Sequence, residues 1–147
     1  MSSQTISSPW RLEWSDELSV CIPEIDAEHK HFIMLINELN RSIISRMGIE
    51  EIKSCMSAIL DDAVAHFTHE ETLFRQWNYP EAEDHAEKHA QLTQALHEIM
   101  STFERGGFDC EWIEAGLKVK QALVAHLLNE DMKYRDYCLK NNLSSSC

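Results

Sequence analysis

The chain has 147 residues, which is enough for one domain with its own core, and no Pro-, Gly- or Ser-rich linker divides it. Its 25 acidic and 13 basic residues give a formal net charge of −12, which disfavours binding to nucleic acid or anionic lipid. No apolar run approaches a membrane span, and the first residues lack the basic and apolar regions of a secretory signal. We therefore expect a cytoplasmic protein, a monomer, with no nucleic-acid or membrane partner.

The five cysteines are odd in number and form no C-x-x-C pair. This pattern favours a reducing compartment over a disulfide framework, so we expect free thiols. Cys55 and Cys138 fall within helical patterns and are expected to pack between helices.

Both ends of the chain are expected to lie outside the helical domain, which we assign to residues 25–138. Residues 1–24 are too apolar for a free tail and too irregular for a helix, so we expect an arm packed on the domain. Its apolar residues are Trp10, Leu12, Trp14, Val20 and Ile22. Residues 139–147 are polar and are expected to form a frayed tail.

Two stretches with apolar residues three and four positions apart predict the first two helices. The first stops near Gly48, and its inward positions are Ile25, His29, Phe32, Ile36, Leu39 and Ile43. The second is broken by Asn78, Tyr79 and Pro80, and its inward positions are Ile52, Met56, Ile59, Ala63, His66, Glu70, Leu73 and Trp77. Imidazole and carboxylate groups therefore occupy positions that should face a core.

A third helix is predicted after Pro80, ending at Gly106 and Gly107. Its inward positions are Ala82, His85, His89, Leu92, Leu96, Ile99 and Phe103. In the fourth, Trp112, Val119, Leu123 and His126 keep the rhythm, and the next inward position is Glu130. If a π-bulge absorbs one residue after His126, the pattern resumes instead at Asp131, Tyr134 and Cys138. The spacing alone leaves Glu130 and Asp131 as alternatives.

Short connections between these helices predict an all-α fold, an antiparallel up-down-up-down four-helix bundle. At about 1.5 Å per residue, the polar groups lie early in the first and third helices and late in the second and fourth. Antiparallel alternation therefore brings all of them to one end. Five imidazoles and two carboxylates exceed what one tetrahedral zinc needs and suit two six-coordinate ions.

The motifs DAEHK, HFTHEE followed by NYP, HAEKH and HLLNED resemble the successive motifs of the hemerythrin family, particularly its bacterial members. The resemblance covers roughly residues 14–134. It implies two non-haem iron ions with a bridging oxo or hydroxo group, and it favours Asp131 over Glu130. The implied metal ligands are His29, His66, Glu70, His85, His89, His126 and Asp131.

The resemblance also implies how these ligands are shared. His29 and His66 would bind a five-coordinate iron, His85, His89 and His126 would saturate the other, and Glu70 and Asp131 would bridge them. Dioxygen would bind at the open iron, and no catalytic side chain would be required.

Apolar residues beside the implied ligands could enclose a small, dry pocket for O2, although the same residues would also serve as ordinary core residues. They are Phe32, Phe67, Leu92, Leu123 and Leu127. Outside the ligand set, His31, His69 and His97 are expected to face solvent, as is Glu71. His69 could instead support a ligand through a hydrogen bond.

The function that follows is reversible dioxygen binding for storage, delivery or sensing, by a protein that is not an enzyme. A diiron redox enzyme, such as a peroxidase or a nitric-oxide-removing protein, and a module that sequesters iron remain alternatives. A ferritin-like oxidase is disfavoured because that architecture needs two Glu-x-x-His motifs, and the chain has one such spacing, Glu28 to His31.

Overall fold

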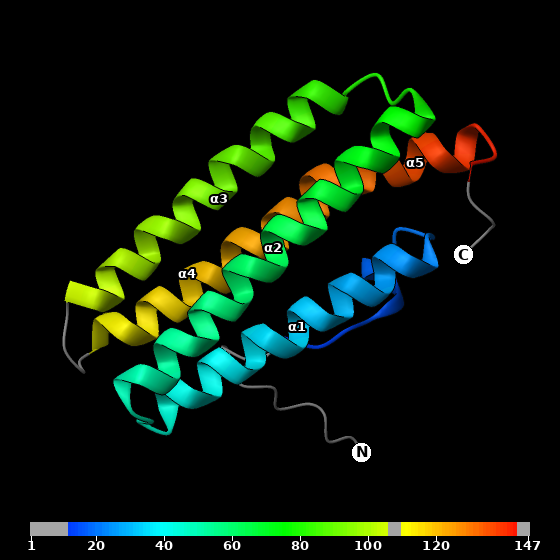
Figure 1. The fold of residues 1–147 in the computed structure, drawn as a ribbon. Helices are drawn as coiled ribbons and strands as arrows, with labels where there is room; N and C mark the ends of the chain where they lie inside the picture. The colour runs from blue at the N-terminus through cyan, green and yellow to red at the C-terminus, as the bar shows by residue number, and fades with distance from the viewer. Residues whose placement is uncertain (1–11, 106–109, 144–147) are drawn as a thin grey trace, which may run out of the picture.

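The computed structural model describes residues 12–105 and 110–143, with side chains for 12–101 and 116–143. A 3₁₀ turn, η2 (Asp16–Leu18), precedes α1 (Pro23–Ile44), α2 (Ile49–Trp77) and α3 (Ala82–Arg105). The last rod consists of α4 (Cys110–His126), a π-helical segment η3 (Leu127–Asp131) and α5 (Met132–Lys140). The described residues contain no strand. The predicted four-helix bundle is confirmed (Figure 1).

The helix ends lie close to the predicted breaks. Pro23 occupies the first turn of α1, where its missing N–H costs no hydrogen bond, and α1 begins two residues before position 25. Asn78 ends α2 in the left-handed conformation, with φ 54° and ψ 43°, and the Tyr79 N–H returns to the Phe74 carbonyl. The short reversal before α3 sets α2 and α3 antiparallel.

The interior is divided into two apolar clusters with polar groups between them. One cluster contains Phe32 and Phe67, whose rings contact His66 and His89. The other contains Phe74 and Tyr134, whose rings contact His85. Helix packing places α1 against α2 and α4, and α3 against α2 and α4, so each rod contributes one face to this interior.

The described part of the N-terminal arm, residues 12–22, runs alongside α1 (Figure 1). The Ser19 hydroxyl and the Val20 N–H both donate to the Asp26 carboxylate, at 2.6 and 2.9 Å. Val20 is fully buried. Trp10 and the residues of the tail after 143 lie outside the described part of the chain.

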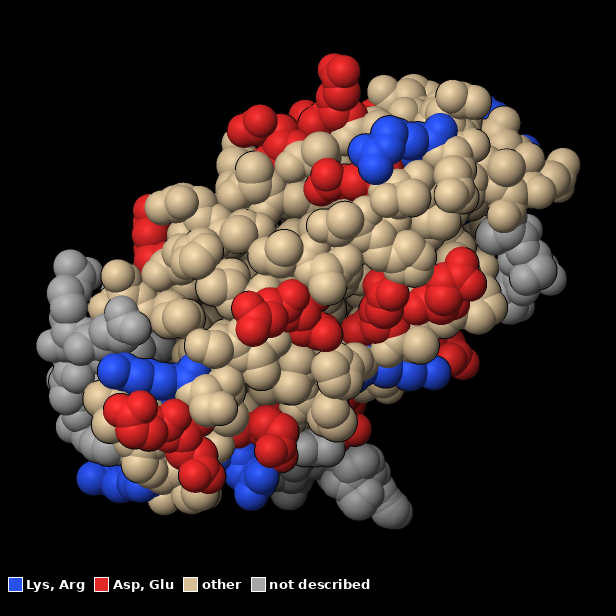
Figure 2. Space-filling model, viewed as in Figure 1, with Lys and Arg blue, Asp and Glu red and all other residues tan. Residues whose placement is uncertain are grey.

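Uncharged residues cover most of the face shown in Figure 2, and its charged side chains are mostly Asp and Glu, with fewer Lys and Arg among them. Among the described helices, none combines the length and apolar character needed to span a bilayer.

The expectation that all cysteines are free thiols is wrong for Cys21. Cys55 and Cys138 are free, and Cys138 is buried among the helices as predicted, but Cys21 is disulfide-bonded. The side chains of Cys110 and Cys147 lie outside the described residues. The odd number of cysteines therefore did not exclude a single bridge.

Candidate metal centre

The π-helical segment decides which carboxylate of the fourth rod faces the interior. Because η3 absorbs one extra residue after His126, the inward register resumes at Asp131, which is 2% exposed. Glu130 points the other way and accepts hydrogen bonds from Lys88 Nζ at 3.1 Å and Lys133 Nζ at 3.5 Å. The π-bulge alternative is confirmed.

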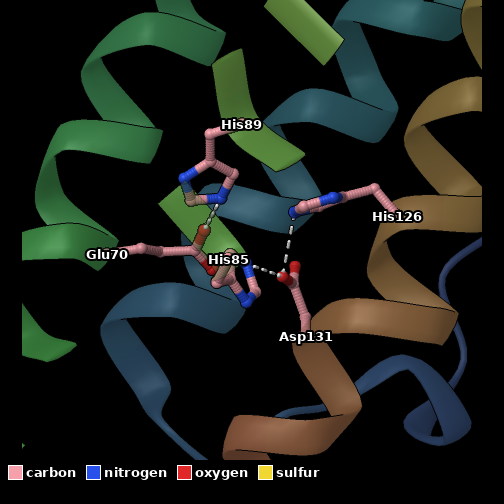
Figure 3. A group of neighbouring side chains, drawn as sticks. All are labelled: Glu70, His85, His89, His126 and Asp131. Atoms are coloured by element: carbon pink, nitrogen blue, oxygen red, sulfur yellow. Dashed lines mark ion pairs between the residues drawn. The ribbon is translucent and has the colours of Figure 1, made fainter. Parts of the chain in front are cut away.

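Seven side chains converge between the two apolar clusters, and every rod of the bundle contributes at least one of them. They are His29 from α1, His66 and Glu70 from α2, His85 and His89 from α3, His126 from α4 and Asp131 from η3. All are buried except His126, whose side chain is 9% exposed. Figure 3 shows five of them, with His89 paired to Glu70 and both His85 and His126 paired to Asp131.

These residues form two groups of potential metal ligands that share both carboxylates. One group combines Glu70 and Asp131 with His85, His89 and His126, and the other combines the same carboxylates with His29 and His66. Within each group, the ligand atoms lie within 4.8 Å of one another.

Each carboxylate directs one oxygen to each group. Glu70 Oε1 lies 3.0 Å from His89 Nε2, while Glu70 Oε2 lies 3.4 Å from His66 Nε2. Asp131 repeats the arrangement. Its Oδ1 lies 3.0 Å from His85 Nε2, and its Oδ2 lies 3.3 Å from His29 Nε2. A carboxylate whose two oxygens face two sets of imidazoles is suited to bridge two cations.

Several of these atoms lack a hydrogen-bond partner among the described residues although they are buried. They are the Nε2 atoms of His85, His89 and His126, Glu70 Oε1 and Asp131 Oδ1. An unsatisfied buried polar atom is costly, and these nitrogens and oxygens lie 3.0–3.2 Å from one another without hydrogen-bond geometry, an arrangement that a cation would satisfy. The residues therefore fit a metal ion.

Three residues outside the ligand groups support individual ligands, and sequence reasoning did not assign them that role. Glu28 accepts from His66 Nδ1 at 2.5 Å, and Glu71 accepts from His89 Nδ1 at 2.8 Å. The Tyr134 hydroxyl donates to Glu70 Oε2. A carboxylate on Nδ1 fixes the tautomer that leaves Nε2 free to bind a metal. The expectation that Glu71 is merely an exposed acid is wrong.

The remaining described histidines lie outside both ligand groups. His31 is exposed and pairs with Asp62 at 3.2 Å, and His97 is also exposed. His69 is about one-third exposed and its Nδ1 lies 2.7 Å from Glu28 Oε2, so it contacts the supporting carboxylate rather than a ligand.

The electrostatics of the cluster favour ionised carboxylates. Burial and the charge of Asp131 oppose ionisation of Glu70, but the surrounding histidines outweigh them and lower its pKa to about 2. At Asp131, the surrounding histidines likewise outweigh burial and hold the pKa of this carboxyl well below its usual range. Burial favours neutral His66, yet Glu70 and Glu28 outweigh it and raise its pKa to about 10. The raised pKa of His66 keeps a positive charge beside Glu70, which a cation would otherwise supply.

A partly enclosed cavity of about 40 Å³ adjoins the centre. Of the five residues predicted to line such a pocket, Phe32, Phe67, Leu123 and Leu127 line this cavity. Leu92 does not; it packs in the apolar cluster with Phe67. The other lining residues are Leu12, Leu18, His29, Ile33, Ile36, His66, Val124, His126 and Asp131. The cavity therefore reaches both imidazoles of one group, His29 and His66, but only His126 of the other group, since neither His85 nor His89 lines it.

The bundle and its buried His/Asp/Glu cluster define a helical protein with a metal-binding centre. A family model described as the hemerythrin HHE cation binding domain matches residues 21–138. The chain therefore belongs to the hemerythrin family.

Curated relatives carry names from the same family. The chain is 30% identical over 131 residues to a hemerythrin-like protein of Naegleria gruberi. The matched stretch covers 89% of this chain and 95% of the relative. The chain is 29% identical over 129 residues to a bacteriohemerythrin of Pseudomonas aeruginosa (strain LESB58), covering 85% of this chain and 80% of the relative. A bacteriohemerythrin of Stenotrophomonas maltophilia (strain R551-3) is 25% identical over 127 residues, with the same coverage.

Proposed function

We propose that this protein binds dioxygen reversibly at two non-haem iron ions, held by the seven residues of the centre. The observation that carries the proposal is the split of both carboxylates. Glu70 and Asp131 each direct one oxygen toward the group of His85, His89 and His126 and the other toward the group of His29 and His66. A pair of iron ions would supply the electrons that dioxygen takes up on binding and returns on release.

Iron fits the donor set better than most alternatives. Imidazole and carboxylate donors without any thiolate suit iron, and seven protein donors are more than one tetrahedral zinc uses. If both carboxylates bridge, the ion beside His85, His89 and His126 has five protein donors and the ion beside His29 and His66 has four. The second ion would then keep a position for an external ligand.

The surroundings of that second position favour a small apolar ligand. The cavity of about 40 Å³ lies beside His29 and His66, and its walls are mainly apolar side chains such as Phe32 and Leu127. That volume exceeds what a single water needs and accommodates a diatomic molecule. Apolar walls keep water and protons from the centre, which slows irreversible oxidation of the iron.

The test is metal analysis combined with visible spectroscopy of the anaerobically reduced protein, before and after O2 and again after deoxygenation. We expect two irons per chain and a charge-transfer band that appears with O2 and disappears when O2 is removed. Irreversible oxidation, with rapid turnover of peroxide or nitric oxide, would replace this proposal with a redox enzyme. Zinc, or iron that never gives the band, would leave only a cation-binding module.

A further inference from the structure

The N-terminal arm forms part of the wall of the ligand cavity. Leu12 and Leu18 line the cavity together with His29 and His66, so the arm and these two imidazoles border the same cavity. The other apolar lining residues come from α1, α2, α4 and η3. Without the arm, the bundle alone would leave this side of the cavity open.

A single side chain of α1 holds the arm at this point through two hydrogen bonds. Asn37 Oδ1 accepts from the Leu12 N–H at 2.8 Å, and Asn37 Nδ2 donates to the Leu12 carbonyl at 2.8 Å. The amide of Asn37 thus pairs with both backbone polar groups of Leu12, as a neighbouring strand would. Leu12 lies outside any helix, so this pairing, rather than a helical hydrogen bond, fixes its position.

Other contacts hold the arm further along, so that Asn37 acts on a short span. Lys30 Nζ lies 5.0 Å from the centre of the Trp14 ring, a cation–π contact. Beyond η2, the Asp26 carboxylate accepts from Ser19 and Val20. Residues 12–18 are therefore a strap along α1, with Asn37 as its outermost described attachment.

We propose that Asn37 is a positioning residue that holds residues 12–18 as the outer wall of the ligand cavity, and that this wall determines which molecules reach the centre. The inference rests on the proposed function. Small apolar molecules fit the closed cavity, whereas water and anions such as azide need the strap to move, because Leu12 and Leu18 offer them no hydrogen bond. Asn37 contacts none of the seven residues of the centre in any hydrogen bond or ion pair of the described chain.

The experiment compares the full-length parent protein, with the metal it carries, against Asn37→Leu and Asn37→Asp. Asn37→Leu removes both hydrogen bonds, while Asn37→Asp keeps the acceptor for the Leu12 N–H and loses the donor to its carbonyl. Asn141→Leu is the matched control, because the Asn141 side chain bonds only to the Tyr137 carbonyl among the described residues, at the far end of α5. The probes are hydrogen exchange at the Leu12 amide, xenon binding followed by NMR, and the rate of azide entry.

In Asn37→Leu we expect Leu12 exchange to accelerate on the order of tenfold, which is the effect of losing one to two hydrogen bonds. Xenon should leave the cavity faster and azide should enter faster, with Asn37→Asp intermediate and Asn141→Leu unchanged. Unchanged Leu12 exchange would overturn the proposal. So would faster exchange with unaltered xenon and azide kinetics, since the strap would then not guard the cavity.

The design separates this inference from the proposed function. Hydrogen exchange and xenon binding do not depend on dioxygen chemistry, so a protein that fails to bind O2 reversibly still reports on the strap. If Asn37→Leu does not fold, Leu12→Ala opens the wall without removing the two hydrogen bonds from Asn37 to the backbone of residue 12. This variant should also speed xenon release. No effect of Leu12→Ala on xenon would again overturn the proposal.

Discussion

The two halves of the centre share their carboxylates but differ in how many imidazoles they hold and in how much of each lines the cavity. The three-imidazole half lies among aromatic rings: Phe67 stacks on His89 with centroids 4.0 Å apart, and Phe74 lies 4.7 Å from His85. Both imidazoles of the two-imidazole half, His29 and His66, line the apolar cavity, whereas only His126 of the other half does. Under the proposed function, one half would hold an ion and the other would leave room beside one.

The two halves differ because α2 and α3 carry different residue types at the same spacing of four. In α3, residues four apart are both histidines, His85 and His89, so the helix gives two nitrogens to one half. In α2, the residue four after His66 is Glu70, whose two oxygens are divided between the halves. Replacing one imidazole by a carboxylate at equal spacing therefore converts a terminal ligand into a shared one.

The largest expected effect comes from removing a shared carboxylate. Asp131→Ala deletes an oxygen from both halves at once, and we expect the metal content to fall from two ions toward none. Glu130→Ala is the matched control, because Glu130 is the adjacent acid and bonds only to Lys88 and Lys133 among the described residues. Metal analysis of the two purified variants decides the matter, and equal metal content in both would remove Asp131 from the centre.

Variants of the supporting carboxylates Glu28 and Glu71 should affect one half of the centre each. Glu28→Gln weakens the support of His66, and Glu71→Gln weakens the support of His89. Each should lower metal affinity by roughly 10- to 100-fold, the usual effect of losing such a partner. Competition with a chelator measures this, and Glu38→Gln, which removes only an exposed pair with Arg41, is the control.

Azide affinity in the same variants sharpens the comparison. Glu28 supports a ligand of the half that faces the cavity, so Glu28→Gln should alter azide affinity, and Glu71→Gln should leave it close to the parent value. A reversed pattern would place the external ligand on the other half.

Much of this centre could be predicted because helical periodicity marks inward positions regardless of tertiary detail. His29, His66, Glu70 and the α3 pair all fall on the apolar face of a regular helix, and the structure brings them together. From the spacing, Asp131 was only an alternative to Glu130, and the family resemblance was needed to choose it, since a π-helical insertion is a local choice of hydrogen bonding that leaves no clear trace in the spacing.

The supporting residues could not be predicted from periodicity. Glu28 and Glu71 each adjoin a ligand in sequence and therefore point away from the core face; only the approach of a neighbouring helix places an imidazole Nδ1 against them. Tyr134 was expected on the inward face, but its bond to Glu70 depends on the distance between rods. Leu12 and Leu18 were missed as cavity residues because the arm has no periodic pattern.

A smaller effect is expected at the wall of the cavity. Leu127→Asn places a polar group beside the two-imidazole half and should admit water, which speeds autoxidation by roughly fivefold, a barrier change of about 1 kcal/mol. Leu128→Asn is the matched control, because Leu128 is the next residue and is 47% exposed. The decay of the oxygenated spectrum gives the rate. An unchanged half-life in Leu127→Asn would exclude this wall from the control of oxidation.

The smallest effect is expected from Tyr134→Phe, which removes the hydrogen bond to Glu70 Oε2 and keeps the ring. The free energy of unfolding should fall by about 1 kcal/mol, with the metal content intact. Tyr137→Phe removes a hydroxyl bound to the Trp77 carbonyl outside the centre and serves as the control. Thermal unfolding measures the stability of both, and loss of metal in Tyr134→Phe would assign this hydroxyl a larger role.

The most direct test of the asymmetry between the halves is a crystal structure of the iron-loaded, oxidised protein with azide. The account predicts one azide per chain, bound to the ion beside His29 and His66 and pointing into the cavity lined by Phe32 and Leu127. Azide on the ion beside His85, His89 and His126, or on both ions, would contradict it.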